Sequence, residues 1–108
     1  MNWRIEYINE AAQKELESWP TDMQAKFYRI TELIQDFGLH KVREPYIKHL
    51  QDKLWEMRVK GRDGIARAIY VTAHEKRLVI LHAFIKKSQK TPSRALRLAS
   101  QRLKELEQ

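Results

Sequence analysis

The 108-residue sequence contains no cysteine, and it has only three glycines and three prolines. The absence of cysteine excludes a disulfide framework and a thiolate metal site, and it suits a reducing cytoplasm. With so few glycines and prolines the chain offers no low-complexity tract or flexible linker, and it has no internal repeat. We therefore expect one domain, residues 1–108, that buries about two-thirds of the surface exposed by its unfolded form.

Long hydrophobic runs are missing as well. No apolar stretch approaches the roughly 18 residues that a transmembrane helix needs. The segment Trp3–Tyr7 mixes charged and apolar residues from the start, which is unlike a signal peptide. We expect a cytoplasmic protein that has no contact with a membrane.

Positive charge is abundant and unevenly distributed. The chain has 21 Lys and Arg against 14 Asp and Glu, a formal net charge of +7. Residues 1–57 hold eight basic and ten acidic side chains, a net of −2, whereas residues 58–102 hold 12 basic and two acidic ones, a net of +10. Charge polarised in this way indicates a polyanionic partner, and nucleic acid is the leading candidate.

The first half of the chain predicts one strand and two helices. Apolar residues alternate with charged ones over Trp3–Tyr7, which is typical of a half-buried strand. Asn9 can cap a short helix that Pro20 ends. A second, amphipathic helix is predicted by apolar residues spaced three and four apart. These residues are Met23, Phe27, Ile30, Ile34 and Phe37.

The second half predicts a three-stranded antiparallel meander over residues 54–60, 65–73 and 78–85. The apolar run 78–81 indicates a strand buried on both faces, with the N-terminal strand as its other neighbour. Residues 39–53 are polar and are interpreted as a long connection. Thr91 is expected to cap a final helix with Pro92 at its first position.

These elements predict an α+β fold with two N-terminal helices, a mostly antiparallel four-stranded sheet and a C-terminal helix. We expect a single core. The residues assigned to it are Phe27, Ile30, Ile34, Trp55, Met57, Ile80 and Leu81.

Arg67 is the most informative charged residue, because it lies within the otherwise apolar strand Ile65–Tyr70. An unpaired guanidinium would be costly to bury there. Either Arg67 forms a buried ion pair with Glu56, or it belongs to an anion site, since its planar fork suits carboxylate and phosphate equally.

Other charges flank Arg67. Glu56, Arg58 and Lys60 alternate along one predicted strand and so share a face. They could be an ordinary solvated face with a cross-strand ion pair. Lys86 and Lys87 follow the last apolar strand, where basic residues often only discourage aggregation. Alternatively, Arg67, Arg58 and at least one of these two lysines converge on one concave patch.

The histidines and the missing motifs limit the possible chemistry. His82 lies mid-strand and is interpreted as a hydrogen-bonded core residue. No histidine has metal-ligand spacing with a carboxylate or thiol partner, so we expect no metal site. The sequence has no phosphate-binding glycine loop and no nucleophile elbow. Such a basic site is still compatible with RNA cleavage, in which a 2′-hydroxyl attacks its own phosphate and fixed cations stabilise the transition state.

Three segments resemble the RelE/HigB superfamily of toxins from toxin–antitoxin systems, and within it the phage-derived HigB-like branch. The segments are Leu54–Arg58, Gly64–Tyr70 and Leu81–Pro92, of which the third is the most specific. The resemblance covers roughly residues 3–105 in element order. It implies a small RelE-like α+β fold with the two N-terminal helices packed on the sheet. It also implies cleavage of mRNA on the ribosome by the 2′-hydroxyl route, without metal or cofactor. It also implies a cognate antitoxin, usually of the helix-turn-helix type.

The resemblance also implies roles for individual residues. Arg67 matches the strand arginine that contacts the scissile phosphate, and Arg58 matches a basic strand residue. Lys86 and Lys87 stand where other members place Arg, His or Tyr for charge stabilisation and proton transfer. The family's frequent tyrosine or histidine is absent from that segment, which leaves the general acid unassigned. Glu56 is either the general base or the residue that orients Arg58.

Other basic residues of the +10 stretch are expected to bind RNA; they are Lys60, Arg62, Lys90 and Arg94. Two alternatives to a nuclease stay open. A basic RNA- or ribosome-binding module without catalysis would have the same charge polarity. A structural interaction domain neutralised by an acidic partner would explain the overall charge but not Arg67 inside its strand.

Overall fold

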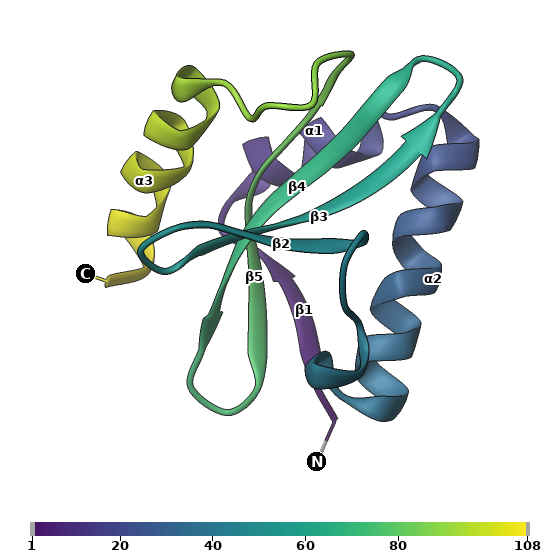
Figure 1. Cartoon of the computed structure of the whole chain (residues 1–108). Coiled ribbons are helices and arrows are strands. Elements are labelled where there is room, and N and C mark those ends of the chain that lie inside the picture. Colours follow the sequence, from purple (N-terminus) through teal and green to yellow (C-terminus); the bar gives the residue numbers. More distant parts are fainter. Residues whose placement is uncertain (1, 108) are drawn as a thin grey trace.

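The computed structural model describes residues 2–107, in which one mixed sheet lies between two layers of helix (Figure 1). The N-terminal elements are β1 (Arg4–Tyr7), α1 (Glu10–Glu17), α2 (Thr21–Phe37) and a short 3-10 helix, η1 (Leu39–Lys41). The later elements are β2 (Ile47–Gln51), β3 (Leu54–Gly61), β4 (Gly64–Ala73), β5 (Arg77–Lys86) and α3 (Ser93–Glu107).

The sheet has five strands in the order β1-β5-β4-β3-β2. The predicted meander is confirmed as β3, β4 and β5, and the N-terminal strand does lie beside β5, parallel to it. The prediction of four strands is wrong. Residues Ile47–Gln51, interpreted as part of a connection, form an antiparallel edge strand against β3. An edge strand with one face in solvent needs few apolar residues, which is why the polar segment gave no strand signal.

The sheet separates two hydrophobic cores, where the sequence predicted one. The first core lies between the sheet and the helices α1 and α2, and it includes Phe27, Met57 and Ile80. The second core lies between the sheet and α3, and it includes Leu81 with Ala95. Leu81 therefore faces the opposite side of the sheet from Ile80, as the alternation of side chains along a strand requires.

Two aromatic residues assigned to apolar faces are exposed instead. Trp55 keeps 39% of its surface exposed, and its ring contacts that of His49 edge to face at 4.8 Å. Phe37, in the last turn of α2, is 62% exposed. The helix ends there because Gly38 takes a positive φ of 97°.

The helix starts follow local hydrogen bonding. The Asn9 side chain accepts a hydrogen bond from the Ala12 N–H and caps α1, as predicted. The last helix begins at Ser93, where the Pro92 carbonyl accepts the N–H groups of Ala95 and Leu96. Thr91 is thus one position too early to be the cap, which corrects the prediction. None of the helices in residues 2–107 has the length and apolar character needed to cross a membrane.

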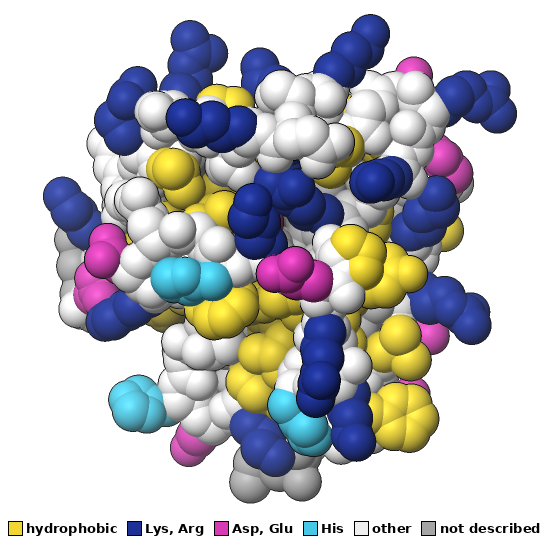
Figure 2. All heavy atoms as spheres, in the orientation of Figure 1, with side chains coloured by type: hydrophobic (Ala, Val, Ile, Leu, Met, Phe, Trp, Pro, Cys, Tyr) yellow, Lys and Arg dark blue, Asp and Glu magenta, His cyan; other side chains and the backbone are white. Residues whose placement is uncertain are grey.

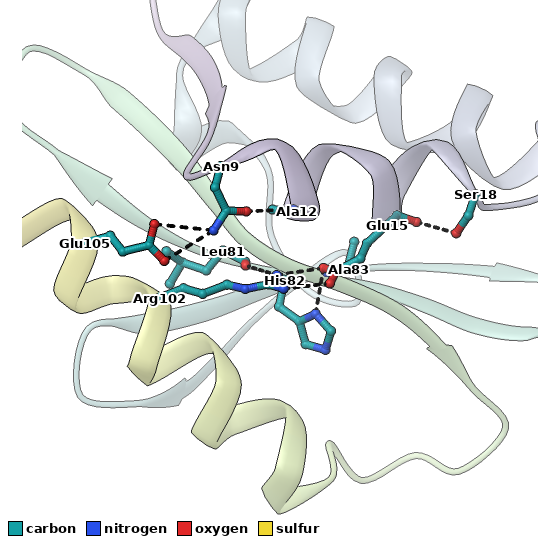
Figure 3. Close-up of polar contacts among 9 residues, drawn as sticks. All are labelled: Asn9, Ala12, Glu15, Ser18, Leu81, His82, Ala83, Arg102 and Glu105. Atoms are coloured by element: carbon teal, nitrogen blue, oxygen red, sulfur yellow. Dashed lines mark hydrogen bonds and ion pairs between the residues drawn. The ribbon is translucent and has the colours of Figure 1, made fainter.

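A polar cluster joins α1, β5 and α3 (Figure 3). The Glu15 carboxylate accepts two hydrogen bonds from the Arg102 guanidinium, each 2.9 Å long, and one of 2.8 Å from His82 Nδ1. It also accepts the Ala83 N–H at 3.2 Å, while Arg102 donates to the Leu81 carbonyl. His82 is therefore a hydrogen-bonded structural residue, and this cluster fastens α3 to the sheet.

Candidate functional site

Two arginines face each other across the centre of the sheet. The antiparallel pairing of β3 with β4 places Arg58 directly opposite Arg67. Arg67 is completely buried, and the Arg58 side chain is 14% exposed. Both lie on the face that α3 partly covers, because they alternate with residues of the first core. Arg58 and Arg67 therefore lie side by side on one face of the sheet.

Main-chain carbonyls of one short segment bind both guanidiniums. Arg67 Nη1 donates to the Lys90 carbonyl at 3.0 Å, and its Nη2 donates to the Ser88 carbonyl. Arg58 Nη2 donates to the Gln89 carbonyl at 2.6 Å. This segment, Ser88–Lys90, connects β5 to α3 and lies over the arginine pair. No sequence pattern predicts these contacts, because a backbone carbonyl is present at every residue.

Glu56 is the only carboxylate that binds this pair within residues 2–107. It is fully buried, and its Oε1 accepts a hydrogen bond of 2.6 Å from Arg58 Nε. The Thr91 hydroxyl lies 2.8 Å from Oε2 and 3.1 Å from Oε1. The ion pair of Glu56 is thus formed with Arg58 and not with Arg67, which corrects one of the two alternatives. Thr91, interpreted only as a helix cap, is a further residue of this cluster.

The cluster leaves positive charge at Arg67 incompletely compensated. Two guanidiniums and one carboxylate give a net charge of 2 − 1 = +1. Burial and the neighbouring Arg58 both lower the pKa of Arg67, and Glu56 opposes them. Arg67 Nε is buried and has no hydrogen-bond partner among the described residues. Like charges directly opposite on a sheet are destabilising, so an anion at this place would be favourable.

Lysines surround the pair on the same face. The strand register aligns Lys60, Ile65 and Lys86 in the row next to Arg58 and Arg67, so Lys60 and Lys86 share their face. Both lysines are exposed. Lys87 lies beyond the end of β5 and is exposed too. Of the two lysines proposed for the site, Lys86 is therefore the one that the sheet directs toward the arginine side.

Three further basic residues of the +10 stretch are exposed, and together with Lys60 they form what we call the exposed rim. Arg62 lies in the β3–β4 turn, Lys90 in the Ser88–Lys90 segment and Arg94 at the start of α3, and all three are exposed. Figure 2 shows Lys and Arg side chains gathered over the upper half of the molecule, where this hairpin and the start of α3 lie. In residues 2–107 no group of three or more His, Cys, Asp or Glu side chains could hold a metal ion.

Comparison with known proteins agrees with this architecture. The profile of a family described as "Phage derived protein Gp49-like" matches residues 14–104. No curated protein is significantly similar to the chain. The free Escherichia coli toxin RelE, solved as a double arginine-to-alanine mutant, is 16% identical with a TM-score of 0.64; the alignment covers 95% of this chain and 99% of RelE.

A second similar structure is the archaeal RelE–RelB complex from Pyrococcus horikoshii. The matched chain is 19% identical to this one with a TM-score of 0.56, and the alignment covers 83% of this chain and 100% of the other. Likeness at these identities establishes the fold. The expected RelE-like architecture is confirmed, with five strands in its sheet.

Proposed function

This chain belongs to the phage-derived Gp49-like family, and from that membership and its buried arginine pair we propose that it is the toxin of a toxin–antitoxin system. In this proposal the protein is a cytoplasmic endoribonuclease. It cleaves mRNA that is bound to the ribosome, and so inhibits translation and growth. The observation that carries the proposal is Arg67, a fully buried guanidinium whose partners are neutral carbonyls.

The proposed reaction is an intramolecular transfer. The 2′-hydroxyl of one nucleotide gives up its proton as its oxygen attacks the adjacent phosphorus, the bond to the 5′-oxygen of the next nucleotide breaks, and that oxygen takes up a proton. The products are a 2′,3′-cyclic phosphate and a 5′-hydroxyl. Negative charge grows on the non-bridging oxygens in the transition state, where preorganised hydrogen-bond donors are most effective. Arg67 and Arg58 supply such donors, and Lys86 and Lys87 add positive charge.

Glu56 is assigned the orienting role in this mechanism. Its carboxylate is completely buried and hydrogen-bonded to Arg58 and Thr91, so no oxygen faces solvent where a 2′-hydroxyl could approach. A general base must come within hydrogen-bond reach of the proton it removes. Glu56 therefore holds Arg58 Nε and leaves the other donors of that guanidinium directed away from it.

The exposed rim is the proposed RNA-binding surface. This surface consists of Lys60, Arg62, Lys90 and Arg94, which carry positive charge around the arginine pair. Among the ion pairs of residues 2–107, none joins one of these four side chains to a carboxylate. Contacts of this kind bind phosphates independently of sequence. We further propose a cognate antitoxin, of the helix-turn-helix type, that neutralises this surface with acidic side chains or covers it.

An alternative function is a basic RNA- or ribosome-binding module that performs no cleavage. One observation favours it: both arginines already bind carbonyls of the Ser88–Lys90 segment. In this alternative the arginines position the segment that carries Lys90 of the rim, and they do not bind the scissile phosphate. The alternative keeps the same RNA partner and differs only in the chemistry.

Expression of the protein in a bacterium, followed by mapping of mRNA 5′ ends, separates these functions. We expect growth arrest with new 5′ ends inside coding regions, and loss of both effects with Arg67→Lys, since a point charge cannot reproduce bidentate phosphate contact. Arg77→Lys is the matched control, because Arg77 lies in the same sheet but pairs with Glu6 at the far end. Growth arrest without new 5′ ends would favour the binding module.

A further inference from the structure

The Ser88–Lys90 segment occupies the place where the proposed function requires a phosphodiester. We infer that this segment is a displaceable lid, whose carbonyl oxygens bind Arg58 and Arg67 in the free protein and are replaced by the oxygens of an RNA phosphodiester. This inference rests on the proposed function and adds a regulatory step to it: the site is closed until substrate opens it.

In the free protein, carbonyl oxygens of the lid occupy the hydrogen-bond donors that a phosphodiester would use. Three consecutive carbonyls, those of Ser88, Gln89 and Lys90, accept hydrogen bonds from the two guanidiniums. A phosphodiester presents oxygen acceptors to the same donors but carries a negative charge. The carbonyl bonds already have a charged donor, but a phosphate adds a full opposite charge and can bind a guanidinium through two oxygens at once, so it can compete with the carbonyls.

The charge of the cluster favours the exchange. With the lid closed the ligands of Arg67 are neutral, and the buried cluster retains its charge of 2 − 1 = +1. Replacing neutral carbonyls by one phosphodiester monoanion brings that charge to zero. Desolvation, which lowers the pKa of Arg67 in the closed state, is then offset by a direct anionic partner.

Several features of the segment favour opening. It has no regular secondary structure, it lies between the end of β5 at Lys86 and the start of α3 at Ser93, and its three side chains are exposed. Within residues 2–107, its carbonyls accept side-chain hydrogen bonds only from the two arginines and, inside the segment, from the Ser88 hydroxyl. Segments with few buried contacts open most readily. Thr91, anchored to the buried Glu56, marks the fixed end of the lid.

The closed lid implies binding in two steps. Exposed Lys87 and Lys90 remain available in the closed state and can attract RNA over a distance. The phosphodiester then displaces the carbonyls and contacts the arginines. Because only the open state binds in this way, apparent affinity is reduced by the fraction of molecules that are open.

Chemical modification of arginine by a dicarbonyl reagent, read by mass spectrometry, tests opening without any RNA. We expect slow modification of Arg67 in the folded protein, accelerated roughly 2- to 5-fold by Gln89→Gly, since glycine increases the freedom of the backbone. The matched control is His74→Gly, an exposed turn residue at the other end of β5, which should leave the rate at Arg67 unchanged. Exposed Arg62 serves as the internal reference in every sample.

Two results of this experiment would overturn the lid. One is that Arg67 stays unmodified in both glycine variants while Arg62 reacts completely. The other is that opening of the lid does not control the reaction of Arg67. In that case Arg67 reacts at the same rate in Gln89→Gly and His74→Gly, or its rate equals the rate of global unfolding measured in urea. Either result would make the segment a permanent part of the fold.

A second experiment adds the ligand as a 2′-deoxy oligonucleotide, which cannot be cleaved by the 2′-hydroxyl route. Because the chain has no cysteine, a spin label on Gln89→Cys reports the lid alone. We expect the oligonucleotide to increase the mobility of this label, to leave a label on Gln101→Cys in α3 unchanged, and to protect Arg67 from modification. An oligonucleotide that binds while the label stays immobile would contradict the lid but leave RNA binding intact. Opening without protection of Arg67 would instead contradict the phosphate contact of the proposed function.

Discussion

Replacement of Glu56 by glutamine separates an orienting carboxylate from a general base. The substitution keeps the shape of the side chain but removes the charge that faces Arg58 Nε at 2.6 Å. Breaking a buried ion pair usually costs about 3–5 kcal/mol. Here the amide oxygen can still accept one hydrogen bond, and Arg58 keeps the Gln89 carbonyl, so we expect a loss of about 2–3 kcal/mol in the free energy of unfolding.

Urea unfolding followed by tryptophan fluorescence measures this loss. With a urea dependence of about 1–3 kcal/mol per molar for a small domain, the midpoint of Glu56→Gln should fall by about 0.7–3 M. The control is Glu6→Gln, which removes a strand carboxylate from a half-exposed pair with Arg77. Its midpoint should change much less, because water screens that pair.

RNA cleavage by the same variant completes the test. An orienting role predicts cleavage that persists, within about tenfold of wild type, under conditions where the variant is folded. A general base contributes about 100- to 10,000-fold to the rate. Loss of cleavage on that scale with an unchanged urea midpoint would refute the reasoning and make Glu56 the base.

Three further predictions concern the fold, the α1–α3 contact and the charge. Phe27→Ala should lower the free energy of unfolding by about 3–5 kcal/mol in urea, because the ring is only 1% exposed. Burial raises the pKa of Glu15, but hydrogen bonds from Arg102 and His82 outweigh it and hold the pKa below its ordinary value of 4.5. The stabilisation from Glu15 is therefore complete above that pH and lost below it, so the destabilisation by Glu15→Gln in urea should shrink between about pH 6 and about pH 3. Affinity for RNA, measured by fluorescence anisotropy, should fall steeply and log-linearly with salt, and a flat salt dependence would exclude the electrostatic rim.

Local patterns predicted most of the fold. The helix of residues 21–37 follows from apolar spacing, and the strands at 54–61, 64–73 and 77–86 follow from apolar runs separated by turns. The edge strand Ile47–Gln51 has mostly exposed side chains, so its sequence lacks the apolar alternation that predicts a strand. The second core was not predicted, because α3 packs on the opposite face of the sheet from α1 and α2. Which face a helix covers depends on the tertiary arrangement, and the apolar spacing within the helix does not specify it.

The candidate site was predicted in part. Arg67 was identified from its apolar surroundings, and Arg58 from its alternation with Glu56. What the sequence could not provide is the Ser88–Lys90 lid, since backbone carbonyls carry no residue signature. Thr91 was assigned a local capping role because Pro92 follows it, whereas its hydroxyl binds Glu56 across 35 residues of sequence. Long-range polar contacts of this kind leave no periodic pattern.

The most direct test of the account is the rate at which purified protein cleaves ribosome-bound mRNA, compared between wild type, Arg67→Lys and the Arg77→Lys control. With all three proteins folded, the account predicts a loss of at least about 100-fold for Arg67→Lys alone, the usual effect of removing a transition-state donor. It also predicts products ending in a 2′,3′-cyclic phosphate and a 5′-hydroxyl. Cleavage by Arg67→Lys within a few-fold of wild type, or products with a 5′-phosphate, would contradict the claim that Arg67 holds the scissile phosphate for attack by the 2′-hydroxyl.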